Sequence, residues 1–403
     1  MTRNQIFTTL EFVNDTIRAV LGEYYNDKFY VYDVFESKCN GLVNGQIADE
    51  KLVSDAIKQI RDAISQKHDI LIEEVVLSLP SDKLIISTFT SSSPVTGRNS
   101  LISQQDINEA YRVARKVRHD ESLAIVSVVP IEYYLDTGEK MEFAPIRYKS
   151  NTFKTLFNVL LLPVDIFETY INVVGACNLK VKEYFLDSEC LYTGLFDEGD
   201  INCAILDLNK FNSSITVFKR GKLLNHYTLN KGSGLIENVI MNKYQVKEND
   251  LNRVVYTLAN ADSQKTNNRA IYKNEDYSDY KYLYQNQVDE LVTDFYKGVF
   301  EELVQLSGNS FDKNIYDVYL SGKASSIRGL DKLFSSVSGC SASVITPGYI
   351  CLNSPECLQT VGLIRLNYRK LLENKTVIDN GQMYVEPRES KFDKFILDED
   401  ELN

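Results

Sequence analysis

A pattern of three short strands separated by turns, followed by glycines, occurs twice in this chain of 403 residues. The first copy spans residues 6–34 and the second spans residues 203–229. An acidic residue, Glu11 or Asp207, stands at the same place in each copy. Glycines precede a predicted helix in both copies: Gly41 and Gly45 in the first, Gly232 and Gly234 in the second. A strand–turn–strand–turn–strand–helix unit that is used twice predicts two related α/β domains facing each other across a cleft.

Charge and composition exclude several classes of protein. The chain carries 44 Lys and Arg against 56 Asp and Glu, a formal net charge of −12. A nucleic-acid-binding protein normally shows a basic face, so we expect no nucleic-acid partner. Three His and seven irregularly spaced Cys without a C-x-x-C motif argue against a metal site and a disulfide framework. With no recognisable signal peptide and no apolar run long enough to span a membrane, we expect a reduced, cytoplasmic protein.

An insertion-like stretch separates the two copies. Residues 82–93 are rich in Ser and Thr and predict a strand pair, and Ser103 caps a predicted helix. Further strands are predicted over residues 124–134 and 152–162. The stretch is therefore predicted to be a compact β-α-β-β module of about 80 residues.

The order of these pieces resembles the actin and heat-shock-chaperone ATPase superfamily, and it most resembles the FtsA family of bacterial cell-division proteins. Four segments carry the resemblance: residues 10–23, 129–136, 232–240 and 318–330. The segment Val-Pro-Ile-Glu-Tyr-Tyr-Leu-Asp at 129–136 is similar to a motif of the small subdomain inserted in FtsA. The resemblance implies an α/β, actin-like two-lobed fold of duplicated ribonuclease-H-like domains with an FtsA-type inserted β-α-β-β subdomain.

The resemblance also implies a division of the chain. Residues 1–80 with 164–190 would form the first lobe, and residues 81–163 the inserted subdomain. Residues 191–232 with 311–372 would form the second lobe, carrying a small subdomain of residues 233–310. Residues 373–403 would be a tail with 9 acidic and 4 basic residues.

In this superfamily ATP and magnesium lie between two hairpin loops, where glycines let backbone N–H groups approach the phosphates. By resemblance, the residues of such a nucleotide cleft would be Glu11, Asn14, Asp15, Asp207, Asn209, Lys210, Asn212, Gly232, Gly234, Asp250, Arg253, Gly322, Lys323 and Ser325. No catalytic residue and no metal ligand is predicted.

The loops of this chain depart from the superfamily pattern. The expected glycines are replaced in all three loops, by Val13 in the first, by Asn209, Lys210 and Phe211 in the second, and by Lys323 and Ala324 in the third. One interpretation is that Lys210 and Lys323 bind phosphate in place of backbone N–H groups. The other is that the cleft has closed, with a lysine pairing Glu11 or Asp207 where magnesium and ATP would lie. We expect weak or absent nucleotide binding, because glycines are lost from three independent loops.

The resemblance implies partners for two other regions. In the family, the lobe matching residues 233–310 binds the C-terminal peptide of the tubulin-like protein FtsZ; here these residues include a Tyr-rich stretch, 272–284. The family's C-terminal helix binds the membrane, and Phe392, Phe395 and Ile396 would be its membrane-facing side chains here. Asp398 to Glu401 follow, however, and anionic lipid repels acidic residues. An interaction tail or a disordered end is the alternative.

The sequence thus predicts an FtsA-like adaptor rather than an enzyme. It would self-associate into actin-like filaments and link FtsZ filaments to other division proteins and to an anionic membrane surface. We expect it in the bacterial cytoplasm, at the cytoplasmic face of the membrane at the division site. The alternatives are a PilM-like pilus-assembly scaffold that binds a membrane protein's cytoplasmic peptide, and a working ATPase of the superfamily.

Overall fold

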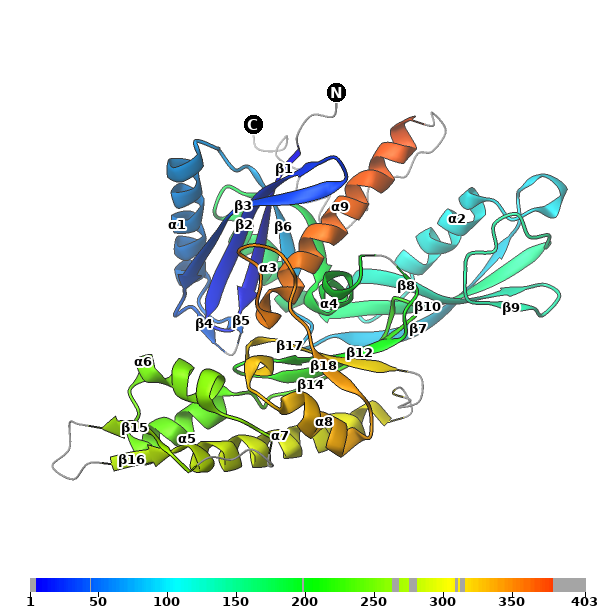
Figure 1. Ribbon diagram of the computed structural model, residues 1–403. Coiled ribbons are helices and arrows are strands. Elements are labelled where there is room, and N and C mark those ends of the chain that lie inside the picture. Colours follow the sequence, from blue (N-terminus) through cyan, green and yellow to red (C-terminus); the bar gives the residue numbers. More distant parts are fainter. Residues whose placement is uncertain are drawn as a thin grey trace.

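The computed structural model describes residues 5–43, 45–197, 199–262, 268–274, 281–308, 311 and 316–379. It has two lobes, each built on a five-stranded sheet, with a further sheet projecting from the first lobe (Figure 1). The α/β two-lobed fold expected from the repeated pattern is confirmed.

The first sheet has the strand order β11-β6-β1-β2-β3. The first three strands along the chain are antiparallel, and β6 and β11 then add in parallel. Its strands are β1 Gln5–Val13, β2 Thr16–Tyr25, β3 Lys28–Lys38, β6 Glu74–Leu79 and β11 Lys180–Leu186. A two-stranded ribbon, β4 Leu42–Val43 and β5 Gln46–Ile47, lies between β3 and the first helix.

Helices cover both faces of this sheet, which explains why β2 is apolar almost throughout. Ile17, Ala19 and Leu21 enter a core shared with the residues of one helical layer, whereas Val20 and Tyr24 pack against the other. The first layer consists of α1 Glu50–His68 and α3 Val164–Gly175; the second consists of α4 Asp187–Leu195 and α9 Leu358–Asp379.

The second sheet, order β14-β13-β12-β17-β18, repeats the topology of the first. Its strands are β12 Cys203–Leu208, β13 Ser213–Lys219, β14 Lys222–Leu229, β17 Asp317–Ser321 and β18 Ala342–Val344. As in the first sheet, an antiparallel triplet is followed by two parallel strands. The duplication predicted from sequence is therefore present strand for strand.

The second lobe carries helices and a small ribbon. The helices are α5 Gly234–Tyr244, α6 Glu248–Leu251, α7 Gln285–Ser307 and α8 Leu330–Ser338, and the ribbon is β15 Ala270–Asn274 with β16 Lys281–Tyr284. Helix α6 continues directly as a π-helical stretch, Asn252–Leu258. Single 3-10 turns occur at Arg98–Ser100, Lys323–Ser326 and Pro355–Cys357.

The inserted subdomain is a four-stranded sheet, order β7-β10-β8-β9, covered by one helix. Its elements are β7 Ile85–Pro94, α2 Gln104–Arg115, β8 Leu123–Leu135, β9 Lys140–Met141 and β10 Thr152–Pro163. Ser103 and Asp106 form the predicted cap of α2. The expected strand pair at 82–93 is wrong, since this segment contributes the single long strand β7.

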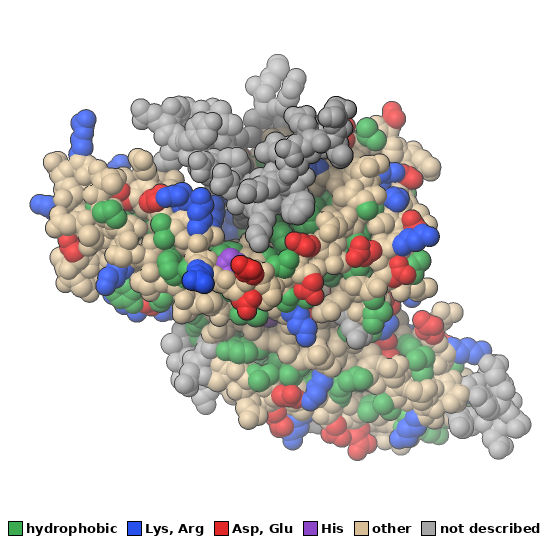
Figure 2. All heavy atoms as spheres, turned by 180° about the vertical axis from the view of Figure 1, so that it is seen from behind, with side chains coloured by type: hydrophobic (Ala, Val, Ile, Leu, Met, Phe, Trp, Pro, Cys, Tyr) green, Lys and Arg blue, Asp and Glu red, His purple; other side chains and the backbone are tan. Residues whose placement is uncertain are grey.

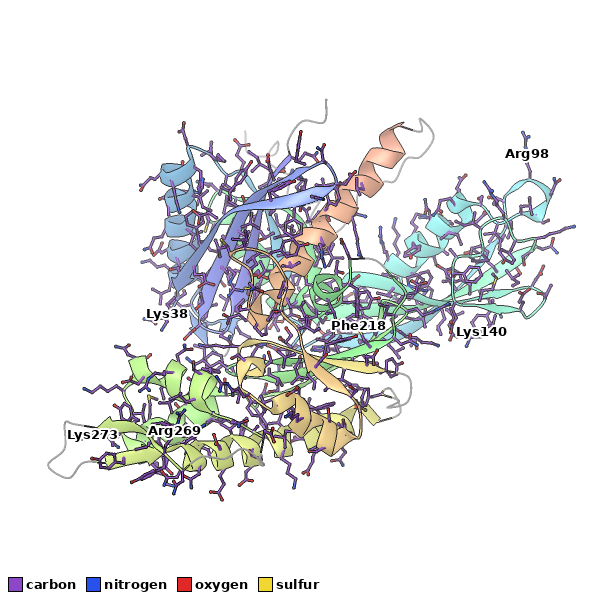
Figure 3. All side chains as sticks on the ribbon, in the orientation of Figure 1. Lys38, Arg98, Lys140, Phe218, Arg269 and Lys273 are labelled. Atoms are coloured by element: carbon purple, nitrogen blue, oxygen red, sulfur yellow. The ribbon has the colours of Figure 1, made fainter. Side chains whose placement is uncertain are left out.

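The hydrophobic core continues from the first lobe into the second. Cys203, Ile205 and Phe218 of the second sheet belong to the cluster that contains α1, α3 and β1 residues. Phe218, labelled in Figure 3, lies near the junction of the lobes and the inserted subdomain. The cleft between the lobes is thus closed off by apolar packing on one side.

Candidate functional site

Four strand ends meet between the two lobes. Strands β1, β6 and β11 run parallel in the first sheet and end there, as does β12 of the second sheet. Each is followed by a polar side chain at its carboxyl end, where ligands commonly bind in α/β sheets. These side chains are Asn14, Asp82, Asp187 and Asn209, and Asp207 is the second-last residue of β12. They line a pocket of about 50 Å³ together with Phe12, Val13 and Phe211. That volume holds a few water molecules.

The two hairpin loops that the resemblance assigns to phosphate binding touch each other directly. The backbone N–H of Lys210 donates to Asn14 Oδ1 at 3.0 Å. The Nζ atom of Lys210 donates to Asp15 Oδ2 at 3.1 Å and lies 3.9 Å from Glu237 Oε2. One residue of the second loop thus joins both the first hairpin and helix α5.

The contact with Lys210 lowers the pKa of Asp15. Partial burial acts to raise the pKa, but the hydrogen bond and the charge of Lys210 outweigh it and lower the pKa below its ordinary value. Asp15 is therefore held as a carboxylate by a lysine of the other lobe. In that geometry Lys210 already has its charge partner within the protein.

The expectation that a lysine pairs Glu11 or Asp207 is wrong, because Lys210 pairs with Asp15 and lies near Glu237 instead. Glu11 is fully buried on the α9 side of the first sheet, where Thr360 Oγ1 donates to it at 2.6 Å and Arg18 lies 3.8 Å away. Burial raises its pKa, although Arg18 and Thr360 act against this shift. The β1–β2 register explains the placement, because Glu11 lies directly opposite Arg18 and so points away from the cleft.

Three aspartates approach one another around the pocket, one of which the sequence singled out. Asn209 Nδ2 donates to Asp207 Oδ2 at 2.6 Å, and Asn212 Nδ2 donates across the lobes to Asp82 Oδ1 at 2.7 Å. Burial, followed by the charge of Asp82, raises the pKa of Asp187 to about 7. Burial likewise raises the pKa of Asp207 to about 6 and raises that of Asp82. These carboxyl groups resist ionisation more than exposed ones do.

Sequence reasoning missed Asp82 and Asp187. Each lies in the connection just after a buried strand, Asp82 three residues beyond β6 and Asp187 one residue beyond β11. The signal that could have found them is the convergence of parallel strand ends at one sheet edge. Glu237 and Tyr256 were missed too, and no sequence motif marks either.

The part of the cleft beside Lys323 is organised around Tyr256. The Nζ atom of Lys323 lies 4.7 Å from the centre of the Tyr256 ring, a cation–π contact. The Tyr256 hydroxyl donates to Glu237 Oε1 at 2.5 Å and lies 2.7 Å from Ser233 Oγ. Lys323 is thus engaged by an aromatic ring of its own lobe.

The glycines at 232 and 234 serve the packing of the second loop. A Cβ at Gly232 would overlap the carbonyl oxygen of Lys210, and one at Gly234 would come within 2.9 Å of it. The Gly234 N–H instead donates to that oxygen at 2.8 Å. Gly322 has φ +80°, and its carbonyl oxygen accepts the Ser325 hydroxyl at 2.7 Å.

Other candidate residues lie elsewhere. Asp250 and Arg253 pair with each other at 3.7 Å, and Arg253 also donates to the Ile271 carbonyl, so the structure does not bring them into the cleft. Phe392, Phe395 and Ile396 lie outside the described residues.

Neither a metal centre nor a membrane span is evident in the described parts of the chain. Across these residues no three His, Cys, Asp or Glu side chains are placed to hold a metal ion together. His226 lines the pocket but contacts two threonines, and burial lowers its pKa to about 4. No described helix combines the length and apolar character needed to cross a bilayer.

Solved structures share the fold of this chain. The chain is similar to a chain of the PilM–PilN type IV pilus biogenesis complex, with a TM-score of 0.60 and 13% identity over 90% of this chain and 98% of that one. It is also similar to MreB5 of Spiroplasma citri bound to ADP, with a TM-score of 0.57 and 11% identity over 92% and 98% of the two chains. At these identities the likeness concerns the fold, which is actin-like.

Proteins with similar sequences are named FtsA. The FtsA of Staphylococcus epidermidis RP62A is 18% identical over 401 residues, which are 96% of this chain and 85% of that protein. The FtsA of Streptococcus pneumoniae D39 is 19% identical over 249 residues, so the match spans 59% of this chain and about half, 52%, of that protein. No protein-family model matches the chain. The resemblance to FtsA is therefore confirmed at low sequence identity, and the fold of the chain is actin-like.

Proposed function

We propose that this chain is a bacterial cell-division adaptor of the FtsA type whose nucleotide cleft is closed by its own side chains. It acts by binding and assembly, without an essential chemical step. The observation that carries the proposal is the direct contact between the two hairpin loops through Lys210. The relatives named FtsA support the biological setting.

The residues present do not fit ATP and magnesium held as in the actin-like superfamily. Ligand pockets typically enclose about 300–1,000 Å³, whereas the pocket here encloses about 50 Å³. Lys210 occupies the gap between the loops, and its Nζ lies 5.4 Å from the centre of the Phe211 ring. Because bulk and internal bonds replace the glycine cradle, nucleotide binding is weak or absent.

The partners proposed for this adaptor are those of the FtsA family. It associates with itself as an actin homologue, binds the C-terminal peptide of FtsZ through the lobe of residues 233–310, and meets other division proteins. We place it in the bacterial cytoplasm, at the cytoplasmic face of the membrane where division occurs. On the proposed FtsZ-binding lobe, α5 presents two exposed apolar side chains, Leu235 and Val239.

Recovery of FtsZ by the full chain from cells that produce it tests this function. We expect FtsZ to co-purify, and Leu235→Ser with Val239→Ser to lower its recovery at least several-fold. Leu71→Ser is the matched control, because Leu71 is an exposed apolar residue of the first lobe. No FtsZ with the unaltered chain, or equal loss in the control, would contradict the proposal.

A PilM-like scaffold is the second candidate, favoured by a specific likeness. The PilM–PilN complex chain is covered over 98% of its length at a TM-score of 0.60. A membrane protein of a pilus system, recovered in place of FtsZ in the same experiment, would favour this candidate. ATP turnover by the chain that Asp207→Ala abolishes would instead favour a working ATPase.

A further inference from the structure

The outer end of the inserted subdomain carries a group of exposed apolar side chains. They come from two segments, 98–102 and 143–149, which backbone hydrogen bonds join: Ile102 N–H donates to Tyr148 O at 2.9 Å and Arg147 N–H to Ile102 O at 2.8 Å. The four side chains, which are 38–52% exposed, are Leu101, Phe143, Ile146 and Tyr148. Together with the three cations described in the next paragraph, they form what we call the tip surface. Clustered exposed apolar groups with a polar rim mark interaction sites.

Three exposed cations surround these side chains: Arg98, Arg147 and Lys149. None of the three forms an ion pair with any residue that the structure describes. By contrast, Lys140 of the same subdomain is paired with Glu132 at 2.7 Å. Arg98 projects from the outermost loop of the subdomain (Figure 3), and Lys and Arg side chains stand beside hydrophobic ones at this end in the space-filling view (Figure 2).

The charge of the chain points to an occupant of the tip surface. Residues 81–163 carry 10 basic and 9 acidic side chains, so the inserted subdomain is close to neutral in a chain of net charge −12. Its three unpaired cations at the tip therefore attract an acidic partner. The partner must also bring apolar groups, because the cations frame an apolar cluster.

One segment outside the described residues has this composition. Residues 392–401 read Phe-Asp-Lys-Phe-Ile-Leu-Asp-Glu-Asp-Glu, with four apolar side chains, at 392 and 395–397, and four acidic ones at 398–401. We infer that this segment docks on the tip surface, with its apolar side chains on the apolar cluster and its acidic run on the cations.

The length of the intervening chain sets how far this segment can reach. Helix α9 ends at Asp379, so 12 residues separate it from Phe392. Extended chain covers about 3.3 Å per residue, or roughly 40 Å here. Helix α9 runs outward on the side of the molecule from which the inserted subdomain projects (Figure 1). A neighbouring copy of the chain can supply the same segment.

An anionic membrane is the competing occupant, and charge speaks against it. The tip cations suit anionic lipid, but the acidic run after Phe395, Ile396 and Leu397 is repelled by it. Docking of the tail on the protein pairs the tip cations with the acidic run. This inference does not depend on the proposed division partners.

Hydrogen exchange of the full chain in the absence of lipid tests the inference. We expect amides of residues 392–397 to be protected at least tenfold. The triple variant Arg98→Glu, Arg147→Glu and Lys149→Glu should remove that protection. The matched control reverses three exposed cations elsewhere, Lys28→Glu, Lys51→Glu and Lys297→Glu, and should leave it unchanged.

Two further variants distinguish docking at the tip surface from a general effect of net charge. Phe143→Ser with Tyr148→Ser should also remove the protection, since it deletes the apolar half of the surface. Asp398→Lys, Glu399→Lys and Asp400→Lys, placed in the reversed-tip variant, should restore it. Protection lost on dilution assigns the tail to a neighbouring copy, and protection kept on dilution assigns it to the same chain.

Three results would overturn the inference. They are unprotected tail amides in the unaltered chain, equal protection in the reversed-tip variant, and protection that arises only when vesicles of anionic lipid are added. The last result would make the membrane the occupant.

Discussion

Lys210 contacts three residues of the cleft through two of its atoms. Its backbone N–H binds Asn14, and its ammonium group binds Asp15 and approaches Glu237. The ammonium group is partly exposed, and ion pairs of this kind each contribute about 0–1 kcal/mol. The backbone contact places the loop, and the charged contacts hold it against the other lobe.

Replacing Lys210 by Met keeps most of the aliphatic stem but removes the charge. We expect Lys210→Met to lower the free energy of unfolding by about 1 kcal/mol, as measured by chemical denaturation. Lys58→Met is the control, because Lys58 forms an exposed pair with Asp55 at 3.9 Å within α1. Equal effects of the two substitutions would show that Lys210 does not join the lobes.

The raised pKa values around the pocket make stability depend on pH. Between the ordinary pKa of an aspartate, about 4, and the raised pKa of Asp187, about 7, the folded state holds a proton that the unfolded state has lost. The stability due to this group is therefore full below about pH 4 and is lost as the pH rises towards 7.

The variant Asp187→Asn isolates that contribution. Between about pH 5 and pH 8, the unaltered chain should lose roughly 2–3 kcal/mol more stability than Asp187→Asn does. His226 has a lowered pKa and acts in the opposite direction, but it is present in both proteins and cancels in the comparison. Parallel pH profiles of the urea midpoint for the two proteins would contradict the prediction.

Helices α4 and α9 cross at close range on one face of the first sheet. A Cβ at Gly194 would overlap the Leu358 carbonyl oxygen, and one at Gly362 would overlap that of Cys190. Glycine therefore sets the distance between these helices. Behind the crossing, Thr360 of α9 binds the buried Glu11, so the same helix covers the charge that sequence reasoning assigned to the cleft.

Adding one methyl group to α9 tests this packing. Gly362→Ala should lower the free energy of unfolding by about 2 kcal/mol or more, because the backbone of α4 must move. Gly298→Ala in α7 meets nothing within 4 Å, and it should raise stability by about 0.5–1 kcal/mol. Thermal unfolding of both variants measures the contrast, and a neutral Gly362→Ala would refute the close crossing.

The elements differ in how far the sequence could predict them. The twice-used hairpin unit could be predicted, because strand period and turn residues are local signals. The position of Glu11 could also have been derived from the sequence. Pairing β1 with β2 across the Asn14–Asp15 turn places Glu11 opposite Arg18, so the two side chains share one face of the sheet. The contact of Lys210 with Asp15 could not be derived, since 195 residues separate them and only the docking of the lobes brings them together.

The two lobes and the inserted subdomain support one another over the whole molecule. Asn158 of β10 donates to the carbonyl oxygens of Leu223 and Leu224 in β14, and Glu142 pairs with Lys219 and Arg220. The apolar core runs without a break from α1 to β12. A cleft enclosed in this way needs no ligand to hold the lobes together.

Isothermal titration calorimetry of the full chain with ATP and magnesium shows whether the closed cleft admits a nucleotide. We predict no saturable heat at micromolar ATP, because Lys210 and the touching loops fill the space between the hairpins. A dissociation constant below about 1 μM, equivalent to about −8 kcal/mol, would contradict it and restore the cleft as a working nucleotide site.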